Sequence, residues 1–144
     1  MTENSSLVIF DCDGVLVDSE PISIAVLREV IAGAGHGIDE AEAYRLFLGR
    51  SMTTISATVA ERLGLCFTPD HLEAIRSQLF ARFRAELKAI TGIRDALLAI
   101  PHRRCVASSS KPERIRLSLE IAGLLDLLEP DIYSATMVKR GKPA

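Results

Sequence analysis

A short apolar run near the start of the chain ends directly in two carboxylates, and this feature constrains the fold more than any other. Residues 7–10 are apolar and β-prone, and polar residues bound them on both sides, as in a buried strand of a parallel sheet. Asp11 and Asp13 follow at once, and Gly14 allows a sharp turn behind them. In open α/β sheets the ligand site lies beyond the carboxyl ends of the strands. The sequence therefore predicts an α/β fold with a candidate site at Asp11 and Asp13.

The spacing of these two carboxylates suits a nucleophilic reaction. One carboxylate can attack an electrophile while its neighbour moves a proton, and a shared divalent cation would offset their mutual repulsion. An Asp-rich turn that only caps the strand is the plainer interpretation. Two further signals along the chain favour the reactive interpretation.

A serine-rich turn gives the first of these signals. Residues 104–107 form a second β-prone run, and the segment 108–111, Ser-Ser-Ser-Lys, follows it before a helix. Hydroxyls and backbone N–H groups at a helix N-terminus form an anion site. Ser108 is nearest to the strand end and is the better ligand candidate, whereas Ser110 begins a capping-box pattern with Glu113 and is expected to be a plain N-cap.

The second signal is Lys142, in a Gly-Lys-Pro segment. It is weak alone, because a lysine near a chain end is usually solvated. Together, the three segments supply the carboxylates, hydroxyls and cation that a phosphate site requires.

The chain between the first two strands has a helical pattern. Helices are expected to begin near Ser19, Asp39 and Thr68, with another apolar helical stripe at Ile55, Val59 and Leu63. We therefore expect a helical domain over residues 20–91, inserted into an α/β core of residues 1–19 and 92–144. Residues 131–134 are a third candidate strand, and three is fewer than the ~5–6 strands of a mean sheet.

Composition excludes several classes of protein. The 144 residues carry 17 Lys+Arg and 19 Asp+Glu, a net charge of −2, so no general basic field favours nucleic acid. The longest apolar run, residues 96–100, is far below the ~18 residues of a membrane span. The first residues lack the basic region of a secretory signal. Cys12, Cys66 and Cys105 are distant and odd in number, which favours neither a disulfide framework nor a zinc site and suggests a cytoplasmic protein.

Three motifs resemble those of a known family. The first strand with DCDGVLVDS, the second with SSSK, and the later GKPA resemble motifs I, II and III of the haloacid dehalogenase (HAD) superfamily. The helical block is similar to the type 1 cap of its β-phosphoglucomutase and phosphoglycolate phosphatase branch. Residues 47–52 and 106–112 look most like bacterial 6-phosphogluconate phosphatases. The resemblance covers essentially the whole chain and implies a Rossmann-like parallel-sheet core with an inserted α-helical cap.

The resemblance implies a role for each matched residue. Asp11 would be the nucleophile that forms an aspartyl-phosphate, and also a Mg²⁺ ligand. Asp13 would be the general acid/base, with its backbone carbonyl reaching the metal. Ser108 and Ser109 would bind the phosphoryl oxygens. Lys142 would neutralise negative charge on Asp11 and on the phosphate.

The cap and the substrate follow from the same resemblance. Gly49 and Arg50 fall where such caps carry a substrate-specificity loop, and a cationic Arg50 would meet an anionic substrate; a solvated surface arginine is an equal alternative. The implied function is Mg²⁺-dependent hydrolysis of a small sugar phosphate or sugar-acid phosphate such as 6-phosphogluconate. A phosphomutase would use the same residues, whereas Asp13 disfavours a haloacid dehalogenase.

The chain departs from the family at its C-terminal side. The fourth motif, an acidic pair that supplies the remaining magnesium carboxylate, has no match in the sequence. We therefore expect a core that is incomplete at its C-terminus, weak magnesium binding and self-association through the incomplete sheet. A catalytically impaired phospholigand-binding or assembly fragment is the remaining alternative.

Overall fold

The computed structural model describes residues 6–143, and its chain divides into two compact units. The first unit joins the segment before Ser19 to the segment after Glu86, and the second unit is the continuous segment Ser19–Glu86. The first unit contains all the strands among the described residues, and the second is helical.

A parallel sheet forms the first unit. Its strands are β1 (Leu7–Phe10), β2 (Arg103–Ser108) and β3 (Ile132–Ser134), in the order β1-β2-β3. Both pairings are parallel, with Ile9 opposite Cys105 and Val106 opposite Ile132. The expected α/β fold class with a parallel sheet is therefore confirmed. β2 extends the expected run by one residue at each end, and β3 begins one residue later than expected.

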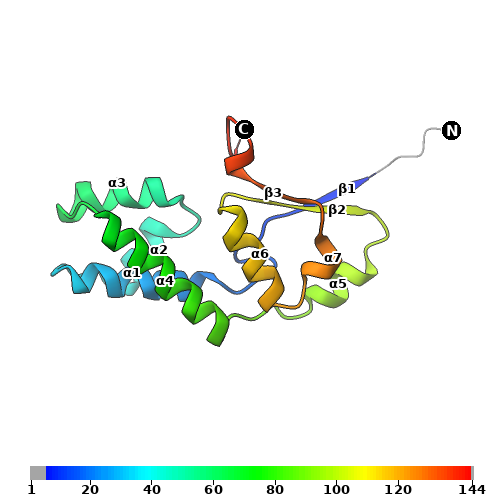
Figure 1. Ribbon diagram of the computed structural model, residues 1–144, viewed down its shortest axis with the longest axis horizontal. Helices are drawn as coiled ribbons and strands as arrows, with labels where there is room; N and C mark the ends of the chain where they lie inside the picture. The colour runs from blue at the N-terminus through cyan, green and yellow to red at the C-terminus, as the bar shows by residue number, and fades with distance from the viewer. Residues whose placement is uncertain (1–5, 144) are drawn as a thin grey trace. The chain divides into compact units, whose positions relative to one another are not determined.

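Helices cover one face of this sheet. Figure 1 shows α5 (Ile93–Ala99), α6 (Pro112–Ile121) and α7 (Leu125–Leu128) on the same side of the strands. Val106 and Ile132 are buried on this side, with Ile115 and Leu119 of α6 among the buried apolar residues. On the opposite face Leu7, Ile9 and Tyr133 are 53%, 62% and 52% exposed. A 3-10 helix, η1 (Ala135–Met137), follows β3 directly.

The second unit consists of the helices α1 (Glu20–Gly33), α2 (Glu40–Phe47), α3 (Met52–Leu63) and α4 (Pro69–Glu86). Asp39 accepts a hydrogen bond from the backbone N of Glu42 at 2.8 Å, so the expected start of α2 is confirmed. Gly64 ends α3 with φ of 67°, a left-handed conformation that glycine adopts without steric cost. Val26, Ile31, Val59 and Phe83 form the centre of its core.

The segment Leu87–Thr91 belongs to the sheet-bearing unit, whereas the sequence pattern assigned it to the helical domain. The backbone N of Asp18 donates to the carbonyl of Lys88 at 2.9 Å, and that of Ile90 donates to Leu16 at 3.0 Å. These bonds tie the returning chain to the segment that follows β1. The division therefore lies after Glu86.

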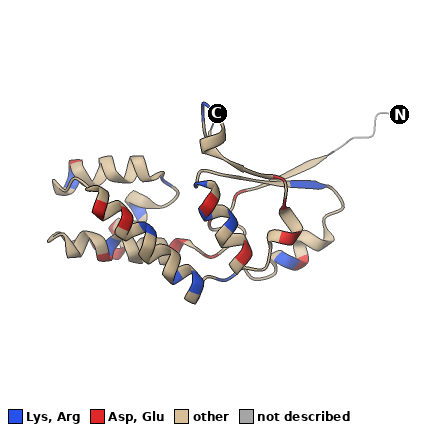
Figure 2. Cartoon of the chain, in the orientation of Figure 1, with Lys and Arg blue, Asp and Glu red and all other residues tan. Residues whose placement is uncertain are grey.

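Charged residues of both signs occur on the helices (Figure 2). Figure 2 shows acidic and basic residues interspersed on the helices of each unit. Within residues 6–143, no helix combines the length and the apolar character that crossing a membrane requires.

Candidate active site

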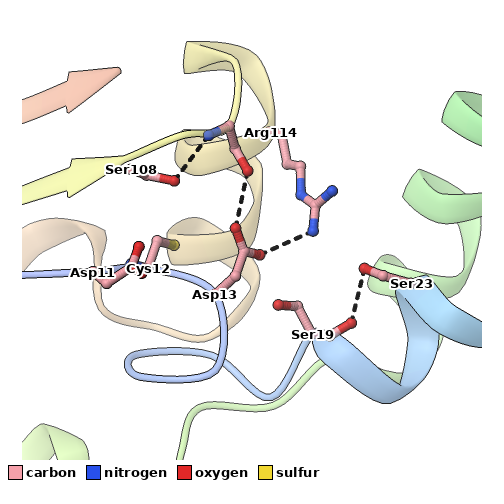
Figure 3. A network of polar contacts seen from close by, with 8 residues as sticks. Asp11, Cys12, Asp13, Ser19, Ser23, Ser108 and Arg114 are labelled. Atoms are coloured by element: carbon pink, nitrogen blue, oxygen red, sulfur yellow. Dashed lines mark hydrogen bonds and ion pairs between the residues drawn. The ribbon is translucent and has the colours of Figure 1, made fainter. Parts of the chain in front are cut away.

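The candidate residues gather where the parallel strands end. Asp11 follows β1, Ser108 is the last residue of β2, and Ser134 is the last residue of β3 and lies opposite Ser108 in the register. Figure 3 shows Asp11, Cys12 and Asp13 on the loop after β1, beside Ser108. The topology thus brings the first two sequence signals together at one edge of the sheet.

Asp11 is paired with the lysine of the third signal. Its Oδ1 lies 3.2 Å from Nζ of Lys142 and accepts a hydrogen bond from the backbone N of Cys12 at 2.8 Å. The side chains of Asp11 and Lys142 are 48% and 47% exposed, so both can reach a molecule in solvent. The structure therefore places Lys142 beside Asp11.

Asp13 has a different environment from Asp11. Ser110 Oγ donates to its Oδ2 at 2.9 Å, and Nη2 of Arg114 lies 3.0 Å from its Oδ1. The side chains of Asp13 and Arg114 are only about a quarter exposed, at 24% and 26%. Both oxygens of this carboxylate are thus held by donors from the start of α6 (Figure 3).

The expectation that Ser110 is a plain N-cap is wrong. Lys111 is the N-cap of α6, and no side chain there makes a capping hydrogen bond. The hydroxyl of Ser110 bonds Asp13 instead. Arg114, which sequence reasoning missed, lies in the first turn of α6. Its partner Asp13 is 101 residues away in the sequence, so no local pattern pointed to this contact.

Ser110 also links the ends of β2 and β3. Its backbone N donates to Ser108 Oγ at 3.1 Å, and its carbonyl accepts from Ser134 Oγ at 2.6 Å. Ser108 and Ser134 are buried, with 4% and 3% of their surface exposed. Ser109 is exposed at the turn. The hydroxyl of Ser108, which accepts from Ser110, retains its own proton for an anion.

Cys12 lies between the two carboxylates and is buried, with 1% of its surface exposed. Burial raises the pKa of its thiol from 9.0 to about 12, and the negative charge of Asp13 adds to the rise. The thiol therefore stays protonated near neutral pH, which is its less nucleophilic form.

Gly49 and Arg50 lie in the loop between α2 and α3 of the second unit. Gly49 has φ of 67°, and the backbone N of Arg50 donates to Phe47 at 3.1 Å. Both residues are exposed, which leaves the Arg50 guanidinium accessible.

The carboxylates at the strand end suit a hard divalent cation. Carboxylate oxygens are the donors that Mg²⁺ prefers, and it is commonly bound through one or two of them together with water and substrate phosphate. Within residues 6–143, both polar contacts of Asp11 engage Oδ1, so Oδ2 is available. No cluster of three or more His, Cys, Asp or Glu occurs in the described part of the chain. The donor set therefore fits a cation completed by water and phosphate.

Comparison with known proteins shows which family the chain resembles. The sequence profile of the haloacid dehalogenase-like hydrolase family matches residues 8–144. The 6-phosphogluconate phosphatase of Escherichia coli (strain K12) is 29% identical over 137 residues, which cover 94% of this chain and 62% of that protein.

Two solved structures of haloacid dehalogenase-like proteins are also similar to this chain. A conserved haloacid dehalogenase-like protein of unknown function from Agrobacterium tumefaciens str. C58 has a TM-score of 0.80 at 34% identity, over 95% of this chain and 63% of that one. A HAD family hydrolase from Deinococcus radiodurans R1, with bound phosphate and sodium, has a TM-score of 0.70 at 31% identity, over 96% and 62%. The chain thus spans less than two thirds of each of these three relatives.

Proposed function

The chain belongs to the haloacid dehalogenase-like hydrolase family, as its motifs predict, and on that basis we propose that it hydrolyses a small phosphomonoester through a covalent intermediate on Asp11. The observation that carries the proposal is the pairing of Asp11 with Lys142 at 3.2 Å, beside a second carboxylate held by its own donors. One carboxylate is thus accessible for attack, and the other is fixed for proton transfer.

In the first step, a carboxylate oxygen of Asp11 attacks the phosphorus, and the bond from phosphorus to the ester oxygen of the substrate breaks. The leaving oxygen takes a proton from the carboxyl group of Asp13. Lys142 offsets the negative charge that builds up on the phosphoryl oxygens. A bound Mg²⁺ would supply further charge stabilisation there, with Asp11 and Asp13 as the residues that would hold it.

In the second step, water attacks the phosphorus of the aspartyl-phosphate, and the bond from phosphorus to Asp11 breaks. The carboxylate of Asp13 removes a proton from that water. Inorganic phosphate leaves, Asp11 returns to its carboxylate form, and Asp13 again holds the proton that the first step requires.

The turn after β2 supports phosphate binding. Ser108 is fixed by the backbone N of Ser110 at 3.1 Å, and the N-terminus of α6 follows at Pro112. Backbone N–H groups and hydroxyls at such a helix start favour anions. Ser108 and Ser109 are the proposed partners of the phosphoryl oxygens.

The substrate class we propose is a small sugar phosphate or sugar-acid phosphate. The name of the E. coli relative, 6-phosphogluconate phosphatase, supports this class. The accessible Arg50 of the α2–α3 loop is proposed to meet the anionic end of the substrate, with Gly49 shaping the loop.

The three cysteines, Cys12, Cys66 and Cys105, are free. Free cysteines support a reducing compartment, and we propose that the reaction takes place in the cytoplasm.

The test is a product analysis with the purified chain. It is incubated with 6-phosphogluconate, sugar 1-phosphates and p-nitrophenyl phosphate, with Mg²⁺ or with a chelator. The expected result is inorganic phosphate, formed only with Mg²⁺. An isomerised sugar phosphate in place of inorganic phosphate would identify a phosphomutase. Binding of phosphate without any turnover would identify a phospholigand-binding fragment, and both results contradict the proposal.

A further inference from the structure

The first turn of α6 contains an arginine, although a positive charge near a helix N-terminus is electrostatically unfavourable. Arg114 lies in the first turn of α6 (Pro112–Ile121), and the positive end of the helix dipole repels a cation there. The Asp13 carboxylate compensates, because it lies 3.0 Å from the guanidinium and is itself an anion at a helix N-terminus. The position of Arg114 is thus favourable only together with Asp13.

The ion pair is also less exposed than another of the same kind on the same helix. Arg116 and Glu129 are equally close, at 3.0 Å, but their side chains are 52% and 45% exposed. The side chains of Arg114 and Asp13 are 26% and 24% exposed. Water and salt screen a partly buried pair less than an exposed one, so Arg114 holds its carboxylate more firmly than Arg116 does.

Ser110 fixes the other oxygen of the same carboxylate. Its hydroxyl donates to Oδ2 at 2.9 Å, while its backbone N and carbonyl are bonded to Ser108 and Ser134. Ser110 is therefore held between the ends of β2 and β3, and its hydroxyl in turn fixes the position of the Asp13 side chain. Two donors on two oxygens leave the carboxylate with one orientation.

We propose that Arg114 is a positioning residue for Asp13, and that with Ser110 it holds the carboxyl group of Asp13 in the orientation in which it takes a proton from water. This inference rests on the proposed function. Removal of a proton from water in the second step requires this orientation of the Asp13 carboxyl group. With a substrate whose leaving group needs no proton, the loss of Arg114 therefore slows the breakdown of the aspartyl-phosphate more than its formation.

The experiment separates the two steps with p-nitrophenyl phosphate, whose leaving group departs without a proton donor. Release of p-nitrophenolate is followed by stopped flow, and phosphoenzyme is quantified by intact mass after acid quench. The chains compared are the wild type, Arg114→Gln, Arg114→Lys, Ser110→Ala and the matched control Arg116→Gln.

We expect Arg114→Gln to lower steady-state turnover about tenfold or more, a part of the ~10²–10⁴-fold that general acid–base catalysis supplies. The fraction of chain present as phosphoenzyme should rise, because formation continues while breakdown slows. Ser110→Ala should act in the same direction, Arg114→Lys should restore part of the turnover, and Arg116→Gln should match the wild type. Equal losses in formation and breakdown, or an equal effect of Arg116→Gln, would overturn the role.

A second measurement does not depend on activity. Urea midpoints are compared for Asp13→Asn, Arg114→Gln and the double variant. We expect non-additive shifts, because each single variant breaks the same contact; additive shifts overturn the inference and leave the proposed function standing. A wild-type chain that forms no phosphoenzyme overturns the proposed function, and with it this role of Arg114, whatever the midpoints show.

Discussion

At the scale of single residues, the two carboxylates of the site differ because their partners differ. Asp11 faces a half-exposed lysine, whereas Asp13 is held by Ser110 and Arg114 and is mostly covered. The same side chain can therefore serve as a nucleophile at one position and transfer a proton at the other.

Replacing Asp11 tests the first of these roles. Asp11→Asn removes the nucleophilic carboxylate but keeps the size of the side chain, so turnover should fall by at least ~10²-fold while far-UV circular dichroism stays unchanged. Turnover is measured as phosphate release by a variant whose mass excludes deamidation. Wild-type kcat in that variant would contradict a nucleophilic Asp11.

The buried thiol gives a prediction with a defined sign. A pKa of about 12 for Cys12 leaves almost no thiolate at pH 8, and the thiolate is the reactive form. Iodoacetamide should therefore label the exposed Cys66 in the folded chain and spare Cys12 until urea is added. Peptide mass spectrometry gives the labelled fraction of each cysteine. Equal labelling of Cys12 and Cys66 in the folded chain would show that Cys12 is accessible.

At the scale of secondary-structure elements, local patterns predicted the long helices and placed each strand to within one residue. β1 has the expected bounds because its apolar residues are contiguous, and α2 begins where Asp39 caps it. The short α7 went unpredicted, because four residues carry too little periodicity and its place depends on the burial of Leu128.

The candidate site was predicted only in part, because local motifs mark some of its residues and contacts between distant segments bring in the others. The motifs contain four of the site residues, namely Asp11, Asp13, Ser108 and Lys142. The hydrogen bonds and the ion pair of these residues lie at the carboxyl ends of the strands. Ser110 was assigned to a local cap, but a carboxylate from a distant part of the chain takes its hydroxyl instead. A contact between distant segments leaves no local pattern, so neither this bond nor the one to Arg114 could be predicted.

The cap of α2 provides a test at this scale. Asp39→Ala removes the hydrogen bond to the backbone N of Glu42 and should lower the free energy of unfolding by about 1 kcal/mol. Asp39→Asn should cost much less, because asparagine caps helices about as well. Urea denaturation of both variants measures the difference. Equal losses in the two variants would show that the negative charge of Asp39, and not its cap, supports α2.

At the scale of the whole molecule, one face of the sheet is open. Leu7, Ile9 and Tyr133 are more than half exposed, whereas parallel sheets are normally covered on both faces. We propose that a second copy of the chain covers this face, and that β1, an edge strand within the described residues, takes part in the contact.

Ile9→Lys tests this proposed self-association. A charge at an exposed position of an edge strand disfavours pairing, so the weight-average mass by sedimentation should rise with concentration for the wild type and stay monomeric for the variant. Leu98→Lys is the matched control, because Leu98 is 60% exposed on α5, away from this face. A wild-type chain that stays monomeric at every concentration would rule the contact out.

The central claim is that a phosphoryl group passes through Asp11, and trapping it tests the claim most directly. The chain is mixed with substrate and Mg²⁺, quenched in acid and treated with borohydride, which reduces an aspartyl-phosphate to homoserine. Peptide mass spectrometry then locates the change. The account predicts homoserine at position 11 in the wild type and none in Asp11→Asn. Steady release of phosphate with Asp11 unmodified at every quench time would contradict it.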